Sequence, residues 1–319
     1  MTADSPNSYA LVADIGGTNT RVALADGAEL LTRTVTKFRN ADHGGLDEVL
    51  AAFLEAQGNV ACSGACVAIA GPVAEGHGKL TNLDWRIDEA TLARATNADK
   101  SILLNDLQAQ GHAVDQLTGS SIRAVMAPET DARQGARLVI GVGTGFNIAP
   151  IYDAGTTRVV PPSEAGHATL PVRTEKELAL SRHLEAQHGS PAIEDMLSGR
   201  GLERLYAWLA GDAEVKTTAQ DIMAEIAEGS SELARETAQM FVRMLGTVAG
   251  NLALNHLPFG GIYFAGGVAR AFSAHFDAYG FADAFRDKGR FSEFMTQFPV
   301  HVIEDDFAAL NGCARYLSG

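Results

Sequence analysis

Short apolar runs that end at glycine, proline or small polar residues recur along the chain, and each predicts a buried β-strand. The clearest of these runs cover residues 66–70, 102–104, 137–142, 261–265 and 300–303. Apolar residues at helical spacing predict helices at 46–54, 88–95, 174–188, 198–209, 230–257 and 307–317. Strands interleaved with helices in this way indicate an α/β fold.

The stretch from Leu11 to Arg21 has the pattern of a strand, a glycine turn and a second strand. Gly16 and Gly17 lack a Cβ, so we expect positive φ values that bring backbone N–H donors close to an anion. Asp14 precedes the turn and suits a water or a Mg²⁺ ion bound to that anion. The residues thus favour a site for a metal-bound polyphosphate, although an ordinary hairpin fits them equally well.

The pattern of strand, glycine turn and strand occurs again at residues 137–152, with a turn at 143–145, and a third glycine turn follows a strand at 266–267. Such a repeat supports two domains of similar architecture. The polar segment 116–135 predicts the boundary between them. The expected domains are a small one of residues 1–115 plus 306–319 and a large one of residues 116–305. Within the small domain, residues 30–38 are expected to form one return strand.

Asn105 and Asp106 follow the predicted strand 102–104 directly. Ligands of open α/β sheets bind beyond the carboxyl ends of strands, so this pair is a candidate binding and catalytic site. Asp106 could also simply cap the following helix, and the two roles are compatible.

Glu164 and His167 lie in a loop after two prolines, and Glu194 precedes a helix. Taken alone, these residues are as well explained by a surface histidine and a charge at a helix end. Three glycine turns are more than one phosphate needs, and a nucleoside triphosphate held between two domains would use all of them. The sequence lacks the Gly-x-x-x-x-Gly-Lys-[Ser/Thr] pattern of a P-loop.

The composition fits a two-domain globular enzyme of 319 residues. A net charge of -14 disfavours nonspecific binding to nucleic acid and to anionic membranes. No apolar stretch reaches the ~20 residues of a membrane span, and no cleavable leader pattern begins the chain, so a cytoplasmic protein is expected. Cys62, Cys66 and Cys313 are predicted to be buried free thiols because their number and spacing suit neither a disulfide framework nor a zinc site.

Seven motifs occur in the order and approximate spacing of the bacterial glucokinase family, which lies within the hexokinase and actin-like ATPase superfamily. They are Asp14-Ile-Gly-Gly-Thr-Asn-Thr-Arg21, Leu104-Asn-Asp106, Gly143-Thr-Gly145, Glu164-Ala-Gly-His167, Leu197-Ser-Gly-Arg-Gly201, Phe264-Ala-Gly-Gly267 and Asp287-Lys-Gly-Arg-Phe291. Each motif is weak alone, but together they resemble the family over almost the whole chain. The resemblance implies an α/β, two-domain actin-like ATPase (ribonuclease H-like) fold, with mixed sheets flanked by helices and an interdomain cleft.

The resemblance also implies a glycolytic transferase, a glucose kinase that uses ATP and Mg²⁺. Asp106 would be the general base on the 6-hydroxyl of glucose, and Asp14 would position the metal. The implied substrate-binding residues are Asn105, Asp106, Glu164, His167 and Glu194. The implied nucleotide-binding residues are Asp14, Gly16, Gly17, Thr18, Asn19, Gly143, Thr144, Gly145, Gly266 and Gly267. By analogy the protein would be a homodimer.

The sequence departs from the family pattern at Ala165, Leu107 and Val142, where glycine, an aromatic residue and proline are common. None of these changes removes a catalytic group. A noncatalytic sugar-sensing regulator on the same fold and a kinase for a related hexose remain alternatives. The sequence does not define the sugar range, the phosphoryl donor or any allosteric regulation.

Overall fold

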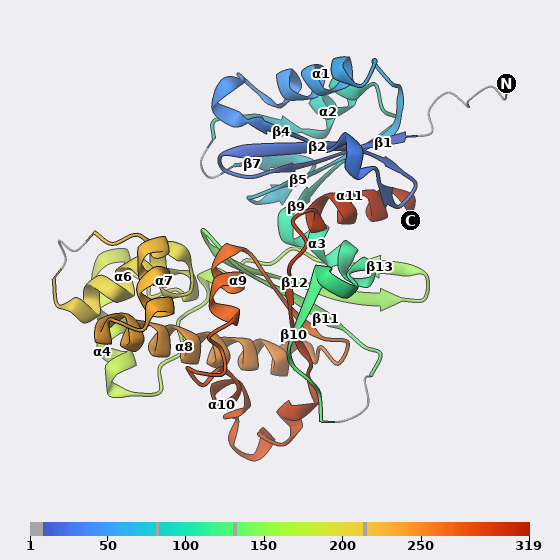
Figure 1. Ribbon diagram of the computed structural model, residues 1–319. Helices are drawn as coiled ribbons and strands as arrows, with labels where there is room; N and C mark the ends of the chain where they lie inside the picture. Colours follow the sequence, from blue (N-terminus) through green and yellow to red (C-terminus); the bar gives the residue numbers. More distant parts are fainter. Residues whose placement is uncertain (1–8, 81–82, 130–132, 213–215) are drawn as a thin grey trace. The chain divides into compact units, whose positions relative to one another are not determined.

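The computed structural model describes residues 9–80, 83–129, 133–212 and 216–319 (Figure 1). The chain divides into two compact units. The first comprises residues 1–118, 155–160 and 305–319, and the second comprises residues 119–154 and 161–304. Within the described ranges no helix is long and apolar enough to cross a membrane.

The first unit is built on a mixed sheet with the strand order β3-β2-β1-β5-β9. Its strands are β1 (Tyr9–Ile15), β2 (Asn19–Asp26), β3 (Glu29–Leu30), β4 (Thr36–Arg39), β5 (Cys62–Ile69) and β9 (Lys100–Asn105). β1 and β2 form an antiparallel hairpin, whereas β1, β5 and β9 run parallel. The register aligns Asp14 with Ala68 and Ala68 with Leu104, so β1 and β9 end at the same edge of the sheet. This edge carries the first glycine turn and the Asn105-Asp106 pair.

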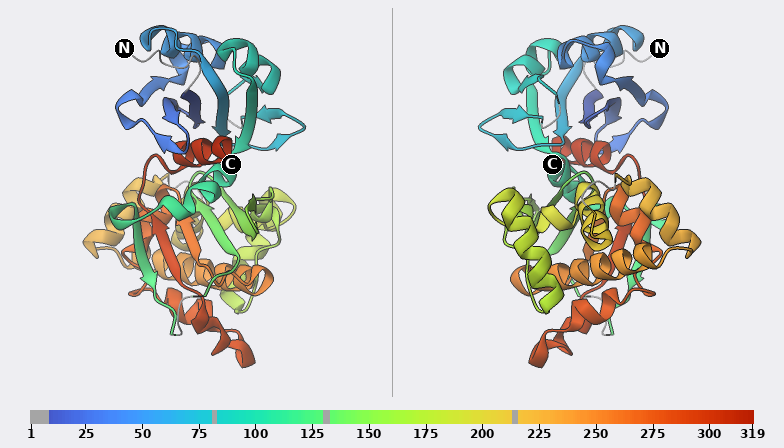
Figure 2. Two further views of the ribbon diagram at one scale, coloured as in Figure 1. Left: turned by 90° about the vertical axis from the view of Figure 1, so that its right-hand side faces the viewer. Right: turned by 90° about the vertical axis from the view of Figure 1, so that its left-hand side faces the viewer.

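Helices cover both faces of this sheet (Figure 1). On one face, α1 (Leu46–Ala56) and α2 (Glu89–Thr96) bury apolar side chains such as Phe53 against the strands. On the other, α3 (Asp106–Ala113) and α11 (Ala308–Ser318) pack Ala109 and Leu310 against β1 and β5. Figure 2 shows α11 in red along this second face. The chain end is therefore part of the first unit's core.

Residues 30–38 do not form the single return strand that the sequence predicts. β3 and β4 each pair with β2, and a 3-10 turn (Thr32–Thr34) separates them. The hydroxyl of Thr34 accepts a hydrogen bond from the backbone N–H of Leu24 at 2.9 Å, so a side chain takes the place of a strand carbonyl there. A small antiparallel sheet that the sequence did not reveal follows β5, with strands β6 (Val73–Ala74), β7 (His77–Lys79) and β8 (Arg86–Asp88).

The second unit repeats the arrangement of the first. Its sheet has the order β10-β15-β14-β11-β12, with strands β10 (Ile122–Met126), β11 (Arg137–Val142), β12 (Phe146–Ala154), β14 (Ile262–Ala265) and β15 (Val300–Ile303). β11 and β12 form an antiparallel hairpin, and β11, β14 and β15 run parallel. The hairpin and two parallel strands match β1, β2, β5 and β9, as the repeated sequence pattern predicts.

Helices of the second unit bury one large apolar cluster against this sheet. They are α4 (Glu175–His188), α5 (Ile193–Met196), α6 (Gly199–Ala210), α7 (Ala219–Glu228), α8 (Glu232–His256), α9 (Gly267–Ser273) and α10 (Phe281–Arg286). Thr174, Ser198 and Ser231 accept hydrogen bonds from backbone N–H groups in the first turns of α4, α6 and α8. Such caps satisfy N–H groups that have no partner within the helix, which explains where these helices begin.

The segment 155–160, which the expected boundaries assign to the large domain, is grouped with the first unit. It contains β13 (Thr157–Val159). Arg158 forms an ion pair with Asp115, and the amide of Gln108 donates a hydrogen bond to the carbonyl of Val160 at 2.7 Å. Cys62, Cys66 and Cys313 are buried free thiols, as predicted.

Candidate active site

The first glycine turn is tight and is held from the inside by a residue that the sequence analysis missed. The N–H of Gly16 donates to the carbonyl of Asn19 at 3.0 Å across the turn. Asn40 is only 2% exposed; its side-chain amide donates to the Gly16 carbonyl at 2.9 Å, and its carbonyl accepts from the hydroxyl of Thr20 at 2.8 Å. Its backbone N–H also donates to Thr18. Gly17 and Thr18 are exposed, so the turn presents backbone to solvent.

The expected positive φ does not occur at Gly16. The turn is closed by hydrogen bonds within an ordinary backbone conformation. Glycine is nevertheless useful here because a side chain would stand between an incoming anion and the backbone.

Asp14 lies at the end of β1, beneath the turn. Burial raises its pKa from 3.8 to about 6, and the Arg21 guanidinium, 3.7 Å away, only partly offsets that rise. A buried carboxylate whose negative charge is not fully compensated is stabilised by a nearby cation. Asp14 therefore has the chemistry of a ligand for Mg²⁺, which binds through one or two carboxylates together with waters and phosphate oxygens. In the described ranges no cluster of three or more metal-ligating side chains occurs.

Asn105, and not Asp106, is the N-cap of α3. Its side-chain carbonyl accepts from the N–H of Leu107 at 3.0 Å, and Gln108 completes a capping box. The amide of Asn105 also donates to the carbonyl of Gly71 at 3.1 Å. The predicted sugar ligand is thus already engaged by the backbone, and its amide also hydrogen-bonds to the Asp106 carboxylate.

Asp106 occupies the first position of α3, with Oδ1 2.9 Å from the N–H of Leu107. Burial is the main cause that raises its pKa from 3.8 to about 7, and the negative charge of Asp14 adds to that rise. Hydrogen bonds from the backbone and from Asn105 oppose the rise only in part. A carboxylate with a pKa near neutrality is well matched to accept a proton from a hydroxyl.

The second glycine turn lies directly against Glu194. The N–H of Phe146, which follows the turn, donates to Oε2 of Glu194 at 2.8 Å. A Cβ on Gly145 would overlap this carboxylate. Glu194, which the sequence suggests as a sugar ligand, therefore lies directly against a glycine turn. Thr144 is exposed at the tip of the turn, and the N–H of Gly143 donates to the carbonyl of Gly145 at 2.9 Å.

The third glycine turn packs against the second. Gly266 has a φ of +95°, which side chains rarely adopt, and a Cβ there would also collide with the carbonyl of Val142. Gly267 is exposed and begins α9. The structure thus places the two glycine turns of the second unit side by side.

Glu164 precedes a 3-10 turn (Ala165–His167) and His167 ends it. Both side chains are exposed, with His167 Nε2 4.0 Å from Glu164 Oε2. A second residue missed by the sequence analysis, Asn147, organises this loop. Its side-chain carbonyl accepts from the N–H of Ala165 at 3.1 Å, and its amide donates to Ser163 and, at 3.4 Å, to Glu164. In the sequence, Asn147 directly follows the Gly143-Thr-Gly-Phe146 segment, and this position was the signal that could have identified it.

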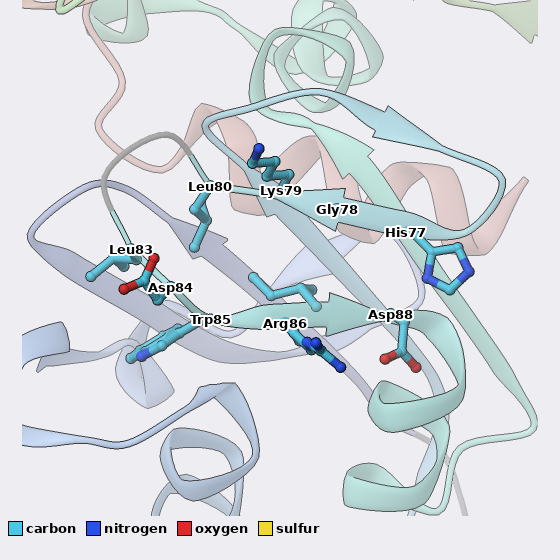
Figure 3. Close-up of a pocket in the computed structure, with 10 residues that line it drawn as sticks. His77, Gly78, Lys79, Leu80, Leu83, Asp84, Trp85, Arg86 and Asp88 are labelled. Atoms are coloured by element: carbon cyan, nitrogen blue, oxygen red, sulfur yellow. The ribbon is translucent and has the colours of Figure 1, made fainter.

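A separate pocket of about 810 Å³ lies in the first unit beside β7 and β8 (Figure 3). His77, Trp85, Arg86 and Asp88 are among its lining residues. Among the residues that the structure describes, none of the predicted site residues lines it, so it does not mark the site built above.

Solved sugar kinases have the same fold. The crystal structure of a glucokinase from an Antarctic psychrotroph matches with a TM-score of 0.84 and 29% identity, covering 97% of this chain and 98% of that chain. The ROK hexokinase of Thermus thermophilus matches with a TM-score of 0.71 at 20% identity, covering 97% and 98%. The chain therefore has the actin-like ATPase fold of this class of sugar kinases.

The family itself follows from the sequence relatives. The glucokinase of Saccharophagus degradans is 33% identical over 313 residues, which are 96% of this chain and 97% of that protein. The glucokinase of Neisseria meningitidis is 32% identical over 323 residues, which are 99% and 98% of the two chains. The family described as Glucokinase matches residues 11–319, and the chain belongs to that family.

Proposed function

We propose that this protein transfers the γ-phosphoryl group of ATP to the 6-hydroxyl of glucose, with Asp106 as general base. The observation that carries this proposal is the position of Asp106 at the start of α3, with a pKa raised to about 7 beside Asp14. Membership of the glucokinase family supports the choice of sugar and of reaction. In the reaction, the 6-hydroxyl passes its proton to Asp106 as its oxygen bonds to the γ-phosphorus, and the bond to the leaving oxygen of ADP breaks.

Phosphoryl transfer requires chiefly positioning and charge neutralisation, because the transferring group is loosely bonded in the transition state. In this proposal the backbone of Gly16, Gly17, Thr18 and Asn19 and that of the 143–145 turn hold the phosphates. The Gly266-Gly267 turn lies under the adenosine. Asp14 would hold Mg²⁺, which would neutralise charge on the phosphates. Its partly uncompensated carboxylate, with a pKa raised to about 6, fits that role.

The proposed sugar ligands are Asn105 and Asp106 of the first unit and Glu164, His167 and Glu194 of the second. Each can donate to or accept from a hydroxyl group. The exposed groups of Glu164 and His167 are available for such contacts, whereas the Asn105 amide would exchange an existing hydrogen bond for one to the sugar. A polyol that is held by several groups of this kind is discriminated strongly, because a missing hydroxyl leaves a polar partner unpaired.

The test is Asp106→Asn, which keeps the size of the side chain and its bond to Leu107 but removes the proton acceptor. We expect kcat to fall by ~10² to 10⁴ while the dissociation constant for glucose changes less than about threefold. Asp88→Asn is the matched control, since Asp88 caps α2 in the same unit and asparagine caps helices equally well. A variant at Asp106 that keeps a tenth or more of the wild-type kcat would rule out the assignment.

Several finer expectations rest on the family. They are a homodimer, a cytoplasmic location, a role in glycolysis, and the use of Mg²⁺ with ATP as the donor. A related hexose in place of glucose is the main alternative substrate, and parallel assays with mannose, fructose and glucosamine would detect it.

A further inference from the structure

The side chain of Glu194 lies against the second glycine turn, residues 143–145. Its Oε2 accepts a hydrogen bond from the N–H of Phe146 at 2.8 Å, and the residue is only partly buried. The bond ties α5 to the point where the turn becomes β12. Hydrogen bonds with an ionised acceptor are about twice as strong as neutral ones, so this contact is substantial.

The backbone around Glu194 leaves space for its carboxylate and for little else. A Cβ on Gly145 would overlap the Glu194 carboxylate, and a Cβ on Gly166 would collide with the carbonyl of Phe146 and contact Glu194 at 3.5 Å. Gly145 thus allows the carboxylate to lie against the turn, and Gly166 allows its own segment to approach the backbone of Phe146. The carboxylate fills the place that a side chain at residue 145 would occupy.

The same segment reaches the turn a second time through its backbone. The N–H of Gly199 donates to the carbonyl of Gly143 at 2.8 Å, and the hydroxyl of Ser198 donates to the carbonyl of Glu194 at 2.8 Å. Residues 194–199 therefore brace both ends of the turn. The contact from Gly199 is made by the backbone, whereas the contact from Glu194 is made by a side chain that can also bind a ligand.

From this geometry we infer that Glu194 is a positioning residue for the phosphate-binding turn, so that one carboxylate serves the nucleotide through Phe146 and the sugar directly. The inference rests on the proposed function, in which the turn binds phosphate. Oε2 holds the turn, and Oε1 is the oxygen for a sugar hydroxyl. A sugar that engages Oε1 also fixes the side chain that holds the turn.

The test separates the two roles by measuring ATP binding without glucose. Glu194→Gln keeps an acceptor oxygen for the N–H of Phe146, whereas Glu194→Ala removes it. By isothermal titration we expect Glu194→Ala to weaken ATP about tenfold or more and Glu194→Gln to stay within about threefold of wild type. Both variants should raise the KM for glucose about tenfold or more, because each removes the charged acceptor for the sugar.

Glu177→Ala is the matched control. Glu177 lies in the same unit, and its carboxylate accepts hydrogen bonds from the N–H groups of Arg173 and Thr174, away from the turn. ATP binding should not change in this variant. If Glu194→Ala binds ATP as wild type does, the inference is overturned while the proposed function stands. If wild-type protein itself fails to bind ATP, the proposed function fails first.

A double-mutant cycle guards against a general loss of structure. Gly145→Ala should displace the Glu194 carboxylate and weaken ATP about as much as Glu194→Ala does. In the Glu194→Ala background the same change should add little, because the space is then empty. Additive losses would mean that the new methyl group obstructs the nucleotide directly, and they would contradict the inference.

Discussion

The candidate residues of the two units are chemically different. In the first unit the carboxylates are partly buried, and the side chain of Asp14 is only 20% exposed. In the second, Glu164 and His167 are 62% and 69% exposed. Burial raises the pKa of Asp14 and of Asp106 and makes Asp106 a better base. Exposed groups instead retain water that a sugar hydroxyl can replace, so Asp106 is suited to proton transfer, whereas Glu164 and His167 are suited to binding.

The first and second glycine turns also differ, namely in the side chain that holds each of them. The first is held by the neutral side chain of Asn40, which is almost fully buried. The second is held by the charged and partly exposed Glu194. A buried amide with several partners gives a permanent support, whereas a partly exposed carboxylate can be influenced by a ligand. Repeated topology therefore does not imply repeated function.

For the exposed residues that are proposed to bind the sugar, the largest expected effect is on the KM for glucose. Glu164→Ala and His167→Ala should each raise it at least about tenfold, which corresponds to ~1.4 kcal/mol. The KM for ATP should remain within about threefold, because neither side chain contacts a glycine turn in the residues that the structure describes. Steady-state kinetics with each substrate varied in turn provides the measurement. A shift in the KM for ATP alone would reverse the assignment.

A smaller effect is expected from Asn147→Asp. The new carboxylate keeps the bond from the N–H of Ala165 but faces the carbonyl of Ser163 and the carboxylate of Glu164, to which Asn147 donates. Like charges repel, so Glu164 should move and the KM for glucose should rise about fivefold. Asn251→Asp is the control, because it makes the same charge change where Lys288 is the partner. An equal rise in the KM for glucose in both variants would show that the added negative charge as such, and not the displacement of Glu164, causes the effect.

The smallest effect is on stability. Because the pKa of Asp106 is higher in the folded protein than the usual 3.8, folding favours its neutral form. Its contribution to stability is complete below about 3.8 and is lost as the pH rises through about 7. Asp106→Asn should therefore raise Tm at pH 8 by about 2 °C, and the difference should shrink as the pH falls towards 4. A lower Tm of the variant at pH 8 would show that Asp106 stabilises the fold.

Much of the fold follows from local sequence. Residues 137–142 and 300–303 form strands at the predicted bounds, and Thr174 and Ser198 cap helices where expected. Each of these features depends on neighbouring residues, which is why periodicity and capping rules recover it. The break in the strand after Leu30 depends on the hydroxyl of Thr34, which periodicity does not register.

The site was less accessible to sequence reasoning because its key contacts are long-range. Asn40 reaches Gly16 from 24 residues away, and Glu194 reaches Phe146 from 48. The family resemblance identified Glu194 as a candidate, but only the folded structure shows that its Oε2 is engaged by Phe146 beside Gly145. Asn40 belongs to no motif, and its buried amide gives no periodic signal.

The most direct test of the account is product formation by the wild-type protein. The protein is incubated with glucose, ATP and Mg²⁺, and ADP and glucose 6-phosphate are quantified in the same samples. The account predicts that the two products appear in a one-to-one ratio, and that leaving out glucose abolishes ADP release. Tight glucose binding without either product would contradict the account and identify a sugar sensor on a kinase fold.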